Sequence, residues 1–233
     1  MVRITLDKPY IPIPVLVAVK YGLLYNWYAA TDARLICADG WEVPTRAKFQ
    51  TLSDYLGGNS VSGGKLKETG NVYWDVWNIA TNEVGFNARG EGGRLANGTF
   101  SGLTTSTLIR IIEGAGLYRA AQIPSGFTNL YMGVSNTNSQ KEGFALRPIK
   151  TTTTLTHGQT GTYTGNDGKV YRTICIGTQE WVADNLCETK YRNGDWIPGF
   201  DGGVYTPFSN AAWAALTTGA LCAYNNDWSN VLI

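Results

Sequence analysis

The stretch DGWEVPTRAKFQTLSDYLGG, residues 39–58, contains the clearest helix signal in the sequence. Thr45 follows a proline and can cap the helix, because its hydroxyl can accept a hydrogen bond from an N–H group of the first turn. Gly57 and Gly58 end the helix, since glycine readily adopts the backbone conformation found at helix C-termini. Between these limits, apolar side chains recur at helical spacing, at Phe49, Leu52, Tyr55 and Leu56.

Outside this helix the sequence predicts mainly short strands and turns. Residues 60–70 suggest a second short helix and residues 211–216 a third, whereas residues 73–102 are loop-like and punctuated by glycine. Short strands are expected within residues 105–148, at 170–176 and at 220–224. This mixture predicts an α+β fold in which short helices pack on small antiparallel sheets.

Two segments differ from the rest in composition. Residues 1–20 contain prolines that prevent a helix, and Val15, Val17 and Val19 alternate as in an edge strand that seeks a partner. We expect an extended N-terminal arm that docks on another subunit, giving a homo-oligomer or a larger assembly. Residues 149–162 are rich in threonine and low in complexity, which predicts a connector.

The composition excludes several classes of partner. The 233 residues carry a formal net charge of +1 without a run of Lys or Arg, and nucleic-acid binding requires the neutralisation of phosphates. No apolar stretch approaches the roughly 20 residues of a membrane-spanning helix. The first residues lack the apolar core of a signal peptide. We therefore expect a protein that is made and used without Sec export; the alternative is a surface protein whose signal peptide has been removed.

The aromatic residues and cysteines point to a packed interior. Aromatics make up 12% of the chain, and we expect the indoles of Trp27, Trp41, Trp74 and Trp181 to be largely buried. Cys37, Cys175, Cys187 and Cys222 are scattered, which favours buried free thiols; one or two disulfides are the alternative outside a cell. The only histidine, His157, lies in the connector, so no metal, cofactor or catalytic triad is expected.

Long, aromatic-rich segments form two groups. The first consists of YGLLYNWYAA (21–30), residues 39–58, GGKLKETGNVYW (63–74), NEVGFNARGEGGR (82–94) and GFALRP (143–148). The second consists of DGKVYRTICIGTQEWVADNL (167–186), TKYRNGDWIP (189–198) and AAWAALTTGALCAYNND (211–227). In these segments the chain resembles the Fibrobacter succinogenes major paralogous domain family, as found in phage or Bacteroidetes-associated surface proteins. The resemblance implies a fold related to C-type lectins and formylglycine-generating enzymes.

The order of the two groups is inverted relative to that family, whose first part corresponds to our second group. The resemblance therefore implies a circularly permuted C-type-lectin-like domain over residues 21–233. In it, residues 21–148 form the family's second part and residues 163–233 its first part, joined by the connector. The connector can span about 40 Å when extended. We expect the two parts to pair within one chain; an exchange of halves between two chains, or two unrelated fragments, are the alternatives.

The resemblance implies binding rather than catalysis. The oxidase among the fold relatives depends on reactive cysteines placed together, and no such motif occurs here. The EPN- or QPD-like tripeptide of calcium-dependent sugar binding is also missing, and Asn225–Asp227 is interpreted as an ordinary turn. Asp184 and Glu188 are interpreted as surface carboxylates rather than an acid–base pair.

In C-type-lectin-like binding proteins the segment before the last strand faces the ligand, and here that segment is Tyr118–Gly143. It is rich in Tyr, which gives contact area at small entropic cost, and in Asn and Ser, which give adaptable hydrogen bonds. The candidate ligand-binding residues are Tyr118, Arg119, Asn129, Tyr131, Ser135, Asn136 and Asn138, with Ser139 beside them. The alternative is a polar β-meander without a ligand.

The sequence thus predicts a non-enzymatic binding module on a large assembly. We expect a bacteriophage virion or tail adhesin that recognises a host surface glycan or protein, made in the host cytoplasm and displayed on the virion surface. Residues 1–20 would contact other virion subunits. The alternatives are a structural decoration or assembly protein of a virion, and a bacterial cell-surface protein.

Overall fold

The computed structural model of the chain describes residues 16–113, 117–135 and 139–232. Its helices are short: α1 (Trp27–Ala30), α2 (Arg46–Tyr55), α3 (Ser62–Leu66), α4 (Asn210–Ala214) and the 3-10 turns η1 (Tyr224–Asn226) and η2 (Trp228–Asn230). The strands are β1 (Leu24–Tyr25), β2 (Trp41–Glu42), β3 (Glu91–Arg94), β4 (Phe100–Leu103), β5 (Ser106–Arg110), β6 (Ala120–Pro124), β7 (Tyr131–Val134), β8 (Ile149–Lys150), β9 (Thr160–Thr164), β10 (Val170–Ile176), β11 (Gln179–Val182), β12 (Phe200–Asp201), β13 (Val204–Tyr205) and β14 (Leu221–Cys222). The predicted α+β class, with short helices and small antiparallel sheets, is confirmed.

The helix predicted from residues 39–58 is α2, and its limits follow from local chemistry. The Thr45 hydroxyl accepts a hydrogen bond from the Lys48 N–H group, so the cap forms as expected. Gly57 follows with a φ of +100°, a conformation that other residues adopt at a cost. The apolar face buries Phe49 and Leu52, whereas Tyr55 is exposed.

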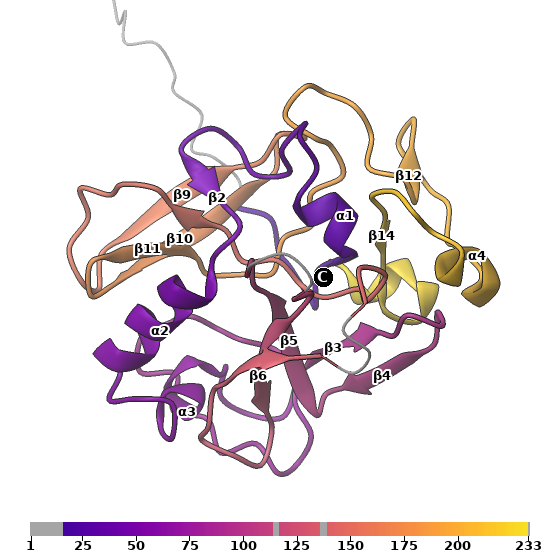
Figure 1. The fold of residues 1–233 in the computed structure, drawn as a ribbon. Helices are drawn as coiled ribbons and strands as arrows, with labels where there is room; N and C mark the ends of the chain where they lie inside the picture. The colour runs from indigo at the N-terminus through magenta and orange to yellow at the C-terminus, as the bar shows by residue number, and fades with distance from the viewer. Residues whose placement is uncertain (1–15, 114–116, 136–138, 233) are drawn as a thin grey trace, which may run out of the picture.

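Two sheets lie on either side of α2 (Figure 1). The larger has the strand order β2-β8-β11-β10-β9, and the smaller has the order β5-β6-β7. Between them lies a core in which Phe49 of α2 contacts Trp181 of β11, with ring centroids 4.9 Å apart. Side chains of β5 and β6 complete this cluster, among them Ile109 and Ile123. The helix thus fixes the position of one sheet relative to the other.

Strands that are distant in sequence pair with each other. β1 pairs with β14, with Leu24 opposite Cys222, and β8 pairs with β11, with Ile149 opposite Trp181. A second core cluster contains Leu23 and Tyr25 from the N-terminal part together with Tyr171 and Leu221 from the C-terminal part. Residues of both predicted family parts therefore contribute to the same sheets and to the same core.

The structure differs from the predicted elements in three places. Residues 73–102, expected to be a loop, contain the antiparallel pair β3 and β4. The expected connector, residues 149–162, contributes β8 and the start of β9 to the five-stranded sheet. Residues 16–20 of the expected arm contact their own domain: the Val17 N–H group donates to the Val170 carbonyl, and Val19 is buried. Residues 1–15 lie outside the described part.

A buried polar chain links three segments of the fold. The Arg147 Nε group donates to the Asn185 side-chain oxygen at 2.7 Å, and the Asn185 amide donates to the Glu91 carboxylate at 3.0 Å and to the Tyr21 carbonyl at 2.9 Å. Burial raises the pKa of Glu91 to about 7, although hydrogen bonds from Thr107, the Leu108 N–H group and Asn185 lower it. Buried charges of this kind are tolerated only when they are hydrogen-bonded.

Gly22 leaves the space in which the Asn185 side chain makes these hydrogen bonds. Its φ of +79° suits glycine, and a β-carbon added there would lie 2.6 Å from the Asn185 β-carbon, which is closer than such atoms pack. The backbone at residue 22 can therefore approach Asn185 closely enough for Tyr21 to accept its hydrogen bond.

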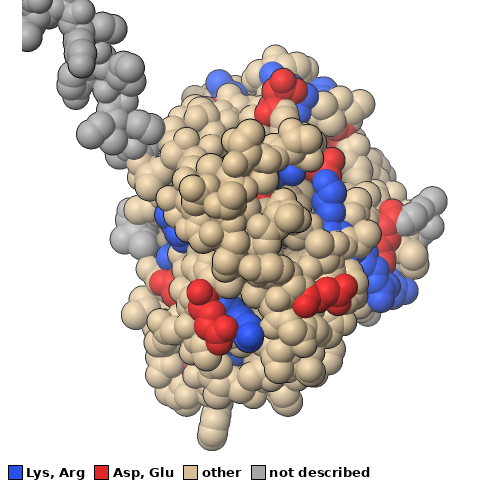
Figure 2. Space-filling model, turned by 90° about the vertical axis from the view of Figure 1, so that its left-hand side faces the viewer, with Lys and Arg blue, Asp and Glu red and all other residues tan. Residues whose placement is uncertain are grey.

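Most of the aromatic and thiol predictions are confirmed. Trp41, Trp74 and Trp181 are buried, whereas Trp27 is only half-buried, against our expectation. All four cysteines are buried free thiols. In the part of the chain that the structure describes, no helix has the length and apolarity needed to span a bilayer. On the face shown in Figure 2, charged side chains lie in small mixed groups separated by uncharged surface.

We predict that the two parts remain associated when the chain is cut once near His157. The backbone there is exposed, whereas the pairs β1–β14 and β8–β11 and the buried chain at Asn185 hold the parts together. A protease site inserted after His157, followed by size-exclusion chromatography, tests this. Separation of the two fragments without denaturant would show that they do not share a core.

Replacing Asn185 with Ala should lower the free energy of unfolding by about 3 kcal/mol, because it leaves buried charged groups without their hydrogen-bond partner. Asn193→Ala is the matched control, since Asn193 is exposed and bonds only to nearby Asp195; its cost should stay below about 0.5 kcal/mol. Urea unfolding followed by tryptophan fluorescence measures both. Equal losses in the two variants would contradict a special role for the buried chain.

Candidate functional site

The predicted ligand-facing segment forms a hairpin, β6–β7, on the edge of the three-stranded sheet. Gln122 lies opposite Tyr131 and Ala121 opposite Met132, so the strands are antiparallel with a register shift near Ala120. Met132 packs against the core. Ala121 pairs with Met132 and Ala120 with Val134, so Gly133 has no partner in the register and forms a bulge in β7. Tyr131 and Met132 are neighbours in the strand and point to opposite faces.

Exposed aromatic side chains are concentrated at this hairpin. Trp77 is 72% exposed, Phe127 58% and Tyr131 44%. Phe127 lies in the β6–β7 turn and Tyr131 begins β7, while the Trp77 backbone lies against Gly126 of the same turn. We use the name hairpin surface for the surface along this hairpin, with Trp77, Phe127 and Tyr131 at its turn end and the half-buried Arg119 and the exposed Arg46 at its other end. Exposed apolar groups gathered in this way are typical of interaction sites.

A buried lysine holds the β6–β7 turn in place. The Lys67 ammonium donates to the carbonyl oxygens of Pro124 at 3.1 Å and Phe127 at 2.9 Å, and also to that of Ser125. Burial lowers the pKa of Lys67 to about 8. The nearby Trp74 ring, 5.5 Å from the ammonium, adds a favourable cation–π contact. The turn that carries Phe127 is therefore fixed from beneath rather than left to solvent.

Two guanidinium groups meet beside Gly133. A β-carbon added to Gly133 would lie 3.3 Å from Nη1 of Arg119 and 3.3 Å from Nη1 of Arg46. Arg119 donates from this nitrogen to the Gly133 carbonyl at 3.0 Å. Arg46, the first residue of α2, donates to the Glu113 carboxylate at 3.0 Å. The glycine, with a φ of +80°, leaves the space in which the two cations approach each other.

The structure brings only some of the predicted site residues together. Arg119 and Tyr131 belong to the hairpin surface. The Tyr118 ring packs edge-on against Trp27, with ring centroids 5.0 Å apart, and Ser135 donates to the Glu142 carboxylate at 2.5 Å. Asn129 is half-buried in the turn, and Ser139 is half-buried beyond the hairpin. Asn136 and Asn138 lie outside the described residues.

Sequence reasoning missed Arg46, Trp77 and Phe127. Arg46 was interpreted only as part of a helix, and Trp77 only as part of a loop. A local signal existed for Phe127, because it follows Pro124, Ser125 and Gly126, residue types that favour turns. No local signal predicts that Arg46 contacts Gly133, since the contact depends on how α2 packs against β7.

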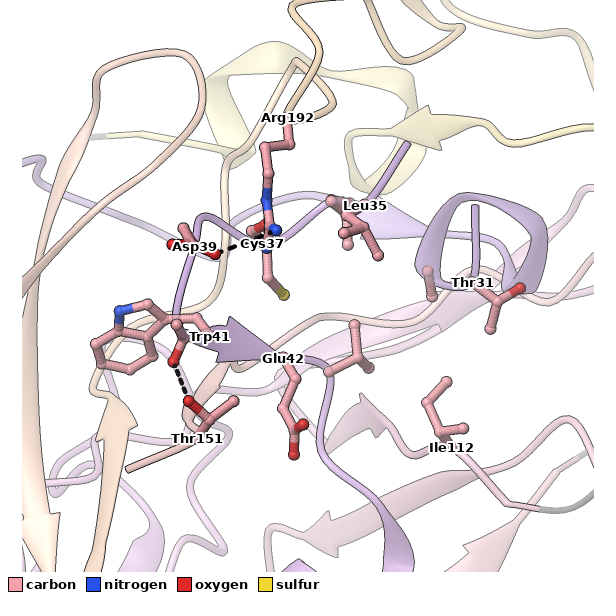
Figure 3. Close-up of a pocket in the computed structure, with 13 residues that line it drawn as sticks. Thr31, Leu35, Cys37, Asp39, Trp41, Glu42, Ile112, Thr151 and Arg192 are labelled. Carbon is pink, nitrogen blue, oxygen red and sulfur yellow. Dashed lines mark hydrogen bonds and ion pairs between the residues drawn. The ribbon is translucent and has the colours of Figure 1, made fainter. Parts of the chain in front are cut away.

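A pocket of about 520 Å³ opens between the end of α1, the following loop and β2 (Figure 3). Its lining is largely apolar, from Ile36, Trp41, Val43 and Ile112 among others. Figure 3 shows the Cys37 sulfur directed toward the middle of the pocket, with Arg192 reaching in from above. The size falls within the range of small-molecule sites.

The polar groups around this pocket are already engaged. Arg192 donates to the Cys37 and Ala38 carbonyls, at 2.9 and 3.0 Å from Nη2, and Thr151 donates to the Gly40 carbonyl at 3.0 Å. Burial raises the pKa of the Cys37 thiol, so the thiol stays protonated and is a poor nucleophile at neutral pH. The pocket offers apolar volume rather than a set of converging catalytic groups.

Elsewhere, the described residues offer few side chains for metal binding or acid–base catalysis. Within residues 16–113, 117–135 and 139–232, no group of three or more His, Cys, Asp or Glu side chains is placed to hold a metal. His157 is exposed and stacks on Tyr55, with ring centroids 5.1 Å apart. Glu188, which we expected at the surface, is buried and accepts the Asn166 and Asp167 N–H groups at 2.6 and 2.9 Å. Its contacts are those of a residue that fixes a turn.

The sequence model of the Fibrobacter succinogenes major domain matches residues 17–150, more than half of the 233 residues. The matched region begins at the strand-like residues before β1 and ends at β8, so it contains α2, the hairpin and the pocket wall up to Ile112. No curated protein and no solved structure matches the chain.

Replacing Lys67 with Met should lower the free energy of unfolding by about 2 kcal/mol, because three carbonyl oxygens lose their shared donor. Lys65→Met is the matched control two residues away, in the last turn of α3, since Lys65 forms a partly exposed ion pair with Glu83. Thermal unfolding followed by circular dichroism compares them. If Lys65→Met costs as much as Lys67→Met, the ammonium does not anchor the turn.

Proposed function

Because this chain belongs to the Fibrobacter succinogenes major domain family, we propose that it is a non-enzymatic binding module displayed on a large assembly. The observation that supports this proposal is the concentration of exposed aromatic side chains on one rigid hairpin. Trp77, Phe127 and Tyr131 present their rings to solvent, whereas most other aromatic side chains are at least half-buried. Rings that stay exposed contribute little to folding, and a ligand that covers them gains the free energy of removing apolar surface from water.

The anchoring of the hairpin favours binding with a small entropic penalty. Lys67 ties the turn to the core, and β7 pairs along its length with β6. A surface that is already ordered loses little conformational freedom when a ligand binds, so more of the contact energy appears as affinity. Tyrosine and tryptophan add large contact areas with few rotatable bonds.

The finer fold assignment is part of this proposal. A circularly permuted C-type-lectin-like domain would bring the two parts of the family into one core. The pairing of β1 with β14 and of β8 with β11 supports that arrangement. The family match covers the part that we assign as its second half.

We also propose, from the chemistry of the described side chains, that the protein does not catalyse a reaction. Burial raises the pKa values of Cys37, Cys187 and Cys222, which opposes thiolate formation. His157 accepts a hydrogen bond from the Gly177 N–H group at 3.3 Å and contacts the Tyr55 ring.

The assembly that we propose is a bacteriophage virion or tail fibre, on whose surface the module recognises a host glycan or protein. Docking of the N-terminal arm on neighbouring subunits stays a prediction for residues 1–15, because residues 16–20 contact their own domain. A virion decoration protein that uses the same fold only as a stable unit is the second candidate. The exposed hairpin surface favours the adhesin over the decoration protein, since a decoration protein needs no solvent-facing aromatic cluster. A bacterial cell-surface protein would use the same hairpin surface.

Replacing Tyr131, Phe127 or Trp77 with Ala should weaken adsorption to host cells about thirtyfold for a central aromatic contact, which corresponds to about 2 kcal/mol. The free energy of unfolding should change by less than about 0.5 kcal/mol, because these side chains are exposed. Adsorption of fluorescently labelled protein to host cells and urea unfolding measure the two quantities.

Tyr55→Ala is the matched control, because Tyr55 is also an exposed aromatic residue but lies on α2 away from the hairpin turn. It should leave adsorption unchanged. If each variant that weakens adsorption also lowers stability, the hairpin is scaffold, and the decoration protein becomes the better assignment.

A further inference from the structure

The hairpin surface contains two cations in addition to its aromatic rings. Arg119 lies just before β6, and Arg46 begins α2, yet their Nη1 atoms approach the same point beside Gly133. Like charges this close repel each other unless an anion lies between or beside them. The Glu113 carboxylate provides one negative charge, through its contact with Arg46. Arg46 therefore has a carboxylate partner, whereas Arg119 donates from Nη1 to a neutral carbonyl, that of Gly133.

Much of the hydrogen-bonding capacity of these guanidinium groups is unused within the described fold. A guanidinium has five N–H donors arranged as a planar fork that matches a carboxylate or a phosphate. In the part of the chain that the structure describes, each of the two arginines makes its hydrogen bond through Nη1. The Arg119 Nε group is buried without a partner, which is unfavourable in the unliganded protein.

The surroundings favour an anion at this point. Arg46 is about half-exposed, so solvent and ligands reach it. It also forms the N-terminus of the ten-residue helix α2, whose aligned peptide dipoles add positive potential there. Tyr131 lies two residues before Gly133 on β7 and is 44% exposed, so a polymer held by the two arginines can extend along β7 to an aromatic ring.

We propose that the hairpin surface binds a carboxylate or phosphate group of an acidic surface polymer between Arg46 and Arg119. This inference rests on the proposed binding function and names the chemical class of the ligand. The aromatic rings contact the uncharged part of the polymer, and the arginine pair selects acidic polymers over neutral ones. Uronic acid polymers and polymers linked by phosphate share this chemistry.

Two variants that break the same ion pair give the test, because they should change binding in opposite directions. Arg46→Gln removes a donor and should weaken binding roughly ten- to hundredfold, as should Arg119→Gln. Glu113→Gln removes the competing carboxylate and should strengthen binding about two- to fivefold. A merely structural ion pair would be lost equally in Arg46→Gln and Glu113→Gln, and both would then bind alike.

Polygalacturonate serves as the carboxylate probe, polyglycerol phosphate as the phosphate probe and dextran as the neutral control, in isothermal titration calorimetry at low and high NaCl. The unaltered chain should bind at least one acidic probe, more weakly at high salt, and should not bind dextran. Lys190→Gln, which removes a cation that stacks on Trp196 outside the hairpin, should leave binding unchanged.

The two acidic probes identify the source of the anion, since binding to one alone assigns a carboxylate or a phosphate ligand. If neither acidic probe binds, or if Glu113→Gln weakens binding as Arg46→Gln does, the anion site is overturned. Host-cell adsorption that depends on Tyr131 but not on Arg46 or Arg119 would also overturn it and leave the binding function intact. Adsorption that depends on none of these residues would remove the binding function itself.

Discussion

The hydrogen-bonded chain from Arg147 through Asn185 to Glu91 is the interaction on which the rest of the fold depends. It lies in the interior, where an unpaired charge is very unfavourable, so each member requires the others to be in place. Arg147 follows the hairpin, Glu91 begins β3 and Asn185 lies in the C-terminal part. Forming these hydrogen bonds therefore brings together three segments that are far apart in sequence.

This constraint positions both sheets. Ile149, two residues after Arg147, pairs with Trp181 of β11, and Asn185 follows that strand. Trp181 in turn packs on α2, which separates the five-stranded sheet from the sheet that carries the hairpin. The orientation of the hairpin is thus set by buried contacts on the opposite side of the helix. The hairpin is thus held in place by buried contacts across the core.

The hairpin surface combines groups that serve different physical purposes. The buried Lys67 ammonium fixes the turn, the exposed rings of Trp77, Phe127 and Tyr131 offer contact area, and the two arginines offer charge. The groups come from α2, the loop after α3, and the hairpin with its preceding residue. Ile112 lines the pocket beside Cys37, and the next residue, Glu113, pairs with Arg46, so the apolar volume and the cations are neighbours in the fold.

The local elements could be predicted from the sequence, because their signals act over a few residues. The cap at Thr45, the helix end at Gly57, the strand 170–176 and the burial of Trp74 and Trp181 all follow from spacing and side-chain type. Sequence reasoning missed β3, since the run EGGR has low strand propensity; this strand exists because β4 and the buried chain hold it. Only the tertiary structure decided that Arg46 joins Arg119 and Tyr131, or that Trp77 reaches the hairpin turn. The physical reason is that such contacts depend on which distant segments pair, and residue periodicity carries no information about the partner of a strand or a helix.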